Sequence, residues 1–176
     1  MHKLTIEEMH RLNVAEYKES EKLPLVLVLD NIRSFHNVGS FFRTADAFRI
    51  GQIFLCGITG CPPSPEIHKT ALGAEDSVDW EYFPDVLDAF QQLRTEGYTI
   101  LAAEQVEGSM KLNEVQLEKG KKYAVVFGHE VHGVSQSAVD ACDGALEIPQ
   151  YGTKHSLNVS VAGGIVVFEF FRQIGK

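Results

Sequence analysis

The chain of 176 residues lacks the short motifs that mark the commonest nucleotide-binding and hydrolytic sites. It contains neither GxGxxG nor GxxxxGK(S/T), so a dinucleotide fold and a P-loop are both unsupported. It also lacks the GxSxG turn of the α/β hydrolases, which leaves a serine nucleophile without support. His129 and His132 lie three positions apart, whereas a zinc-protease helix needs four, so no metal is expected.

Cysteines and long apolar runs are also scarce. Cys56, Cys61 and Cys142 form neither a disulfide framework nor the paired CxxC pattern of structural zinc, which favours reduced thiols. The longest apolar runs, at residues 23–29 and 159–168, are too short to span a bilayer. Residues 1–22 are rich in Glu and Lys and lack the apolar core of a signal peptide. We therefore expect a cytoplasmic protein with no membrane partner.

Positive charge is in short supply. The formal net charge is −8 at pH 7, which argues against a protein held to nucleic acid by its overall charge. Any nucleic acid would have to be bound by a few local cations. The hydrophobic content of 44% and the length are those of one globular domain.

Apolar runs and helical periodicity alternate along the chain, which predicts an α/β fold. Strands are predicted at residues 25–29, 53–55, 78–83, 98–102, 123–127 and 145–148. Helices are predicted at residues 4–20, 37–48, 66–71, 85–95, 135–141 and 156–173. In the helix over 37–48, Asn37 is the expected N-cap and Gly51 the terminator. The alternation indicates a mostly parallel sheet flanked by helices on both faces, with 1–22 as an N-terminal helical extension of a single domain over 23–176.

The predicted C-terminal helix is apolar around most of its circumference. Such a helix must be buried on more than one side. Gly163 and Gly164 weaken it locally, and a close approach by another backbone would compensate. A dimer interface explains both features, and so does a fully internal helix; we favour the interface.

Polar residues that could do chemistry follow several predicted strands. Taken singly, each has a structural explanation. Arg43 can be a surface arginine whose stem covers apolar residues. Glu130 can cap a helix, and Ser156 and Asn158 suit the cap of the last helix.

Taken together, three segments of the chain point to a known family. Residues 37–45, 127–135 and 148–162 resemble, in this order, the three motifs of the SpoU (TrmH) family of SPOUT methyltransferases. That resemblance implies a deep trefoil knot in the C-terminal part of the sheet, which the periodicity of the chain does not show. It also implies transfer of a methyl group from S-adenosylmethionine to a ribose 2′-hydroxyl of tRNA or rRNA, with tRNA preferred.

The resemblance implies a role for individual residues as well. The cofactor would be held largely by backbone groups at strand ends. These positions are Ala103, Glu104, Gly128, Ile148, Pro149 and Leu157. Arg43 would lie beside the 2′-oxygen, where a cation can bind the adjacent phosphate and stabilise the developing alkoxide. Asn37 and Glu130 would orient Arg43 and the loops, while Ser156 and Asn158 would shape the knot and contact substrate or partner.

RNA and a second copy of the chain are the expected partners. The resemblance implies a homodimer in which each active site is completed by the partner subunit. Candidate RNA contacts are Arg33, His36, Arg49, Lys69, Lys154 and His155. The main alternative is a knotted RNA-binding or ribosome-assembly factor that has lost catalysis. A third is an unrelated α/β domain that binds a small nucleotide.

Overall fold

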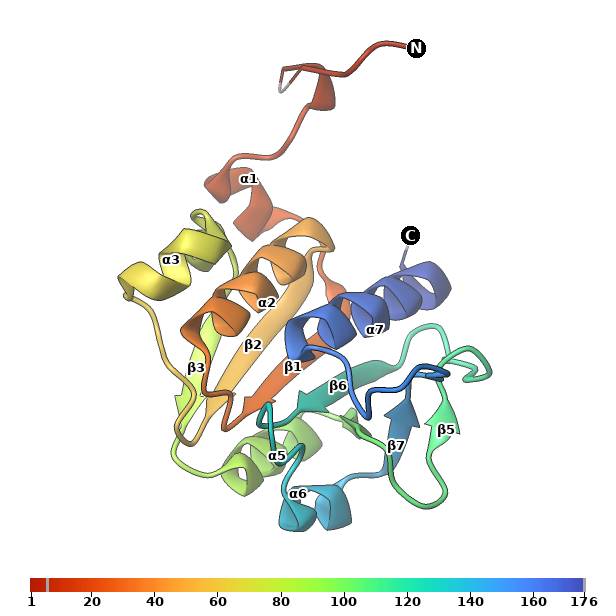
Figure 1. The fold of residues 1–176 in the computed structure, drawn as a ribbon. Helices are drawn as coiled ribbons and strands as arrows, with labels where there is room; N and C mark the ends of the chain where they lie inside the picture. Colours follow the sequence, from red (N-terminus) through yellow and green to blue (C-terminus); the bar gives the residue numbers. More distant parts are fainter. Residues whose placement is uncertain (6, 176) are drawn as a thin grey trace.

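A seven-stranded sheet forms the centre of the computed structural model, which describes residues 1–5 and 7–175 (Figure 1). The strand order is β3-β2-β1-β6-β4-β7-β5, and every pairing is parallel. The strands are β1 (Leu23–Asp30), β2 (Ile50–Cys56), β3 (Trp80–Phe83), β4 (Tyr98–Ala103), β5 (Met110–Lys111), β6 (Lys122–Phe127) and β7 (Gly144–Glu147). Because all strands run the same way, their carboxyl ends meet at one edge. The predicted parallel sheet is confirmed; β5 was not predicted.

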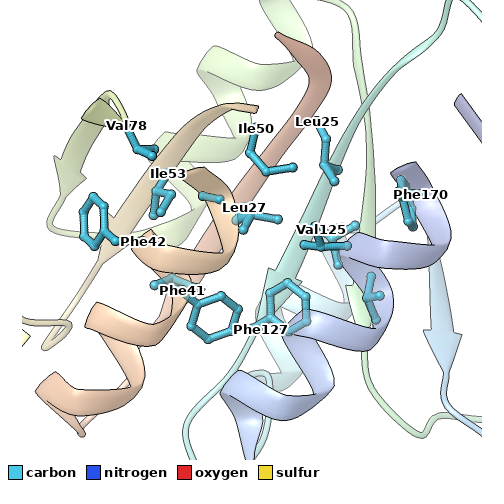
Figure 2. Close-up of a cluster of buried hydrophobic side chains, with 14 of the residues drawn as sticks. Leu25, Leu27, Phe41, Phe42, Ile50, Ile53, Val78, Val125, Phe127 and Phe170 are labelled. Atoms are coloured by element: carbon cyan, nitrogen blue, oxygen red, sulfur yellow. The ribbon is translucent and has the colours of Figure 1, made fainter. Parts of the chain in front are cut away.

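Helices cover both faces of this sheet, as predicted. They are a 3₁₀ turn η1 (Glu7–Met9), α1 (Val14–Glu19), α2 (Phe35–Ala47), α3 (Pro65–Ala71), α4 (Ala74–Ser77), α5 (Val86–Thr95), α6 (Gln136–Ala141) and α7 (Val159–Ile174). Along β1, Leu25 and Leu27 point to the face covered by α2 and α7, while Val26 points to the face covered by α5. Figure 2 shows the core on the face covered by α2 and α7, where Phe41 and Phe170 pack onto the sheet.

The N-terminal helix predicted over 4–20 is shorter than expected, and Ile6 within it lies outside the described residues. Only α1 is α-helical, because Asn13 forms a capping box that starts it: Asn13 Oδ1 accepts from the Glu16 amide at 3.0 Å, and Glu16 Oε2 accepts from the Asn13 amide at 2.8 Å. Tyr17 on α1 is 4% exposed and belongs to the core. The segment 1–22 is therefore partly built into the domain.

Helix α2 starts before Asn37, which corrects the predicted cap. Ser34 is the N-cap, and its Oγ accepts from the Asn37 amide at 3.3 Å. The side chain of Asn37 is thereby left for other contacts. The helix ends at Ala47, and the turn is made by Arg49 in the left-handed region at φ 49°. Gly51 lies in β2 and does not terminate the helix.

Helix α7 starts at Val159 with Asn158 as its cap, so Ser156 is not part of it. One face is buried against α2 and the sheet. The other face leaves Val161, Ile165 and Phe168 exposed by 52%, 41% and 55%, which rules out a fully internal helix in the single chain. Gly163 makes room for the ring of Phe41, since a Cβ there would lie 2.3 Å from Cε1. The close approach at Gly163 is thus made by a side chain and not by a backbone.

Candidate active-site cleft

A cleft of about 500 Å³ lies at the carboxyl ends of β4, β6 and β7. Polar groups at neighbouring strand ends are the usual ligand site of open parallel sheets. Three loops line it, from residues 103–106, 127–134 and 146–157. Among the predicted cofactor contacts, the lining includes Ala103, Glu104, Gly128, Ile148 and Leu157. Pro149 lines a neighbouring apolar groove beside α7 instead.

The loop after β6 is tightly folded because it contains glycine where no side chain fits. A Cβ on Gly128 would lie 2.1 Å from the carbonyl carbon of Gly133 and from the amide nitrogen of Val134. Gly133 has φ 68°, a conformation that favours glycine, and the Cβ it lacks would meet Glu104 Oε2. The Gly133 amide donates to the carbonyl of His129 at 2.8 Å. The turn thus places two residues without side chains in the lining of the cleft.

Glu130 joins that loop to the start of α2. Its carboxylate accepts hydrogen bonds from the Arg33 amide at 3.0 Å, the Ser34 amide at 2.9 Å and Asn37 Nδ2 at 2.8 Å. Partial burial on its own would raise the pKa of Glu130, but these hydrogen bonds outweigh it and hold the pKa below its usual value. The side chain is therefore a fixed anion at neutral pH.

Asn37 continues the network to the third motif. Its side chain donates to Glu130, and its Oδ1 accepts from Asn158 Nδ2 at 3.2 Å. Asn158 in turn caps α7 by accepting from the amides of Ser160 and Val161. The chain Glu130–Asn37–Asn158 links residues that lie 121 positions apart at its widest. The structure thus brings together one predicted residue from each motif.

Arg43 and Ser156 are not part of this hydrogen-bonded network. Arg43 follows Asn37 by six residues on α2, which places it about 9 Å further along the helix and about 120° around it. It is exposed and does not line the cleft of its own chain. Ser156 lines the cleft mouth from an exposed loop.

The candidate RNA contacts are all exposed but are not gathered in one place. Arg33 and His36 flank the start of α2. Lys69 on α3 lies close to the start of α2, since its neighbour Thr70 donates to the carbonyl of His36 at 2.9 Å. Lys154 and His155 belong to the last cleft loop. Arg49 precedes β2, at the amino ends of the strands, so the structure places it away from the cleft.

Sequence reasoning missed several residues around the cleft. Ser160 Oγ lies 3.3 Å from Asn37 Oδ1, and Gln105 donates to the carbonyl of His155. Asp30 at the end of β1 is 2% exposed and accepts from Ser135 Oγ at 3.3 Å. Burial raises the pKa of Asp30, and its hydrogen bonds oppose this only in part. Ser160 and Ser135 lie inside the recognised motifs, so the sequence could have pointed to them. Nothing in the sequence points to Gln105.

Two structural features are absent from residues 1–5 and 7–175. No helix in this part of the chain combines the length and apolar character needed to cross a membrane. No group of three or more His, Cys, Asp or Glu side chains in it is arranged to hold a metal ion.

Comparison with known proteins agrees with this geometry. The sequence model of the SpoU rRNA Methylase family matches residues 24–168. The chain belongs to the SpoU methylase family. The resemblance inferred from the three motifs is therefore confirmed, while the knot stays a prediction.

Known relatives match over most of the chain. It is 34% identical over 166 residues to the tRNA (guanosine(18)-2′-O)-methyltransferase of Thermus thermophilus, covering 94% of this chain and 84% of that protein. The structure of the A. aeolicus TrmH/SpoU tRNA modifying enzyme matches with a TM-score of 0.80 and 29% identity, over 91% of this chain and 80% of that one. The AdoMet-bound rRNA methyltransferase of Sinorhizobium meliloti matches with a TM-score of 0.78 and 26% identity, over 88% of this chain and 61% of that longer one.

Proposed function

We propose that this chain transfers the methyl group of S-adenosylmethionine to a ribose 2′-hydroxyl of tRNA. The observation that carries the proposal is the hydrogen-bonded chain Glu130–Asn37–Asn158, which joins the three family motifs around one cleft. The relative from Thermus thermophilus is a tRNA 2′-O-methyltransferase that matches over nearly the whole chain. We propose that the enzyme is cytoplasmic. Its catalytic domain would be residues 23–176, with residues 1–22 as an extension.

The cleft suits the methyl donor. A volume of about 500 Å³ lies within the usual range for a small-molecule site, about 300–1,000 Å³. Gly128 and Gly133 line the cleft without side chains, so backbone groups at this wall could recognise an adenine edge without charged side chains. Glu104, Ile148 and Leu157 would complete the contacts. When bound, the sulfonium donor supplies an already activated methyl group, so the chain needs only to align the reactants and help the proton leave.

Arg43 is the proposed cation for the attacking ribose. Within the described part of the chain it has no hydrogen-bond or ion-pair partner, so its guanidinium is available to an RNA phosphate. A guanidinium almost never deprotonates, and we therefore assign it to phosphate binding and to stabilising the developing alkoxide. Asn37 and Glu130 fix the start of the helix that carries it. Arg33, His36, Lys69, Lys154 and His155 are proposed RNA backbone contacts.

A homodimer would bring Arg43 to a cleft. The exposed apolar face of α7 borders a groove of about 530 Å³ that is also lined by Leu112, Ile148 and Pro149. Contiguous exposed apolar surface of this kind marks interaction sites. We propose that two copies pair through this face, so that Arg43 of one copy faces the cleft of the other. This pairing would account for the absence of Arg43 from the cleft of its own chain.

The experiment is methyl transfer from radiolabelled S-adenosylmethionine to tRNA isolated from a strain that lacks the enzyme. The expected product carries a single 2′-O-methylated ribose, mapped by resistance of the adjacent phosphodiester to alkali. RNA binding without transfer would instead support the inactive assembly factor. Binding of adenine nucleotides but not of S-adenosylmethionine would support the small-nucleotide domain.

A further inference from the structure

Two consecutive residues at the carboxyl end of β4 hold the two long loops of the cleft. Glu104 Oε2 accepts from the Val134 amide at 3.0 Å, and thereby contacts the loop after β6. Gln105 Nε2 donates to the carbonyl of His155 at 2.8 Å, and thereby contacts the loop after β7. Both residues line the cleft. The end of β4 is therefore the place where the two loops are positioned relative to each other.

The loop after β7 depends on this contact much more than the other loop does. Residues 151–158 are all exposed, and Tyr151 is 94% exposed. Between residues 150 and 157, the Gln105–His155 bond is the one hydrogen bond that the structure gives to any other described segment. Ser156 and Leu157, which follow His155 directly, line the cleft. Their position relative to the cleft therefore depends on Gln105 on one side and on Asn158, which bonds Asn37, on the other.

We propose that Gln105 is a positioning residue for the methyl donor: its amide holds the loop 150–157 so that Ser156 and Leu157 close one wall of the cleft. The inference rests on the proposed function and adds a residue outside the family motifs. A surface hydrogen bond contributes modestly, but a loop held by little else spends less time in its binding-competent position without it. The apparent dissociation constant then rises by the inverse of the competent fraction.

Two substitutions of Gln105 separate the loss of its N–H group from the effect of an added charge. Gln105→Met and Gln105→Glu keep the length of the side chain and remove its N–H group, while only the second adds a charge. Gln105 is exposed, so both variants should fold with unchanged melting temperature. Gln91→Met, at an exposed position on α5, is the matched control.

The measurements are calorimetric affinities for S-adenosylmethionine and S-adenosylhomocysteine, and amide hydrogen exchange of residues 150–157. Both Gln105 variants should bind both nucleosides about three- to tenfold more weakly and exchange faster in this loop, whereas Gln91→Met should match the unaltered protein. At saturating donor, methyl transfer should return to within about twofold of the unaltered rate, because the chemistry itself is untouched.

Unchanged affinity in both variants would overturn the role of Gln105, whether or not the loop exchanges faster. Weaker binding by Gln105→Glu alone would also overturn it, since charge and not the lost donor would then be the cause. Failure of the unaltered protein to bind either nucleoside would overturn the proposed donor itself. The two failures are thus distinguishable.

Discussion

The two long loops of the cleft are built in opposite ways. The loop after β6 is fixed by three hydrogen bonds to Glu130, one to Glu104 and a glycine contact with no spare room. The loop after β7 is exposed from 151 to 158, and between residues 150 and 157 it has a single hydrogen bond to the rest of the described chain. One wall of the cleft, the loop after β6, is thus held in place before any ligand binds. The other wall, the loop after β7, has few contacts that hold it. Substitutions in the first wall should therefore cost stability and binding together, and substitutions in the second should cost binding alone.

The largest effect is expected for Gly128→Ala, which changes the loop after β6 at its closest backbone contact. The new Cβ would lie 2.1 Å from backbone atoms of Gly133 and Val134, which cannot move aside as a flexible side chain could. We expect a loss of about 3 kcal/mol in unfolding free energy, measured by urea denaturation, and loss of donor binding. Gly152→Ala is the control in the other loop, because nothing lies within 4 Å of its added Cβ. Equal stability of the two variants would contradict the comparison.

A smaller effect is expected for Glu130→Gln. The amide retains one acceptor oxygen and turns a donor toward either the Arg33 amide or the Ser34 amide, so at least one of these hydrogen bonds is lost. We expect destabilisation by about 2 kcal/mol in urea denaturation, with methyl transfer reduced as α2 loses its attachment to the loop. Glu107→Gln, an exposed carboxylate just beyond β4, should leave both unchanged. A Glu130 variant as stable as the Glu107 control would show that the wall is held by packing alone.

Acid should weaken the same wall. The pKa of Glu130 is lower in the folded chain than its usual value, so its contribution to stability is fully present above about pH 4.3 and disappears as pH falls through the folded pKa. The stability difference between the unaltered protein and Glu130→Gln should therefore shrink between about pH 5 and pH 3. Asp30 gives the opposite sign, because burial raises its pKa and protonation favours the folded state. As pH rises across this range, the stabilities of Glu130→Gln and Asp30→Asn should depart from that of the unaltered protein in opposite directions, measured by denaturation curves at each pH.

The smallest effect in the series belongs to Gln105, where only the loosely held wall is changed. Its variants should keep their stability and lose about three- to tenfold in donor affinity, as given above. Compared with the Gly128 and Glu130 variants, the Gln105 variants show how much less the loop after β7 contributes to the stability of the fold than the loop after β6. A Gln105 variant that lost as much stability as Gly128→Ala would abolish the distinction.

The sequence predicts the sheet well because buried parallel strands are continuous apolar runs, such as residues 25–29. It does not predict β5, since Met110 and Lys111 carry no pattern and pair with β7 only through tertiary contact. The start of α2 was misplaced because Ser34 and Asn37 are both good caps, and the choice depends on the contact between Asn37 and Glu130. The motif residues could be proposed from the sequence because they occur together in three ordered segments, whereas Gln105 meets His155 fifty positions away without any local signal.

Arg43 shows a different limit. Helical geometry fixes its place on α2 but cannot say which cleft it faces. The single chain leaves Arg43 outside its own cleft, so the proposed mechanism depends on the proposed second copy.

The most direct test of the account is complementation between two inactive variants. Arg43→Ala should abolish transfer yet bind the donor normally, and Ser156→Trp, which fills the cleft mouth, should bind no donor. Mixed, unfolded and refolded in equal amounts, they should recover about a quarter of the unaltered activity, because half of the random C₂ dimers then contain one complete site. A mixture as inactive as its two components would contradict the claim that Arg43 of one copy serves the cleft of the other.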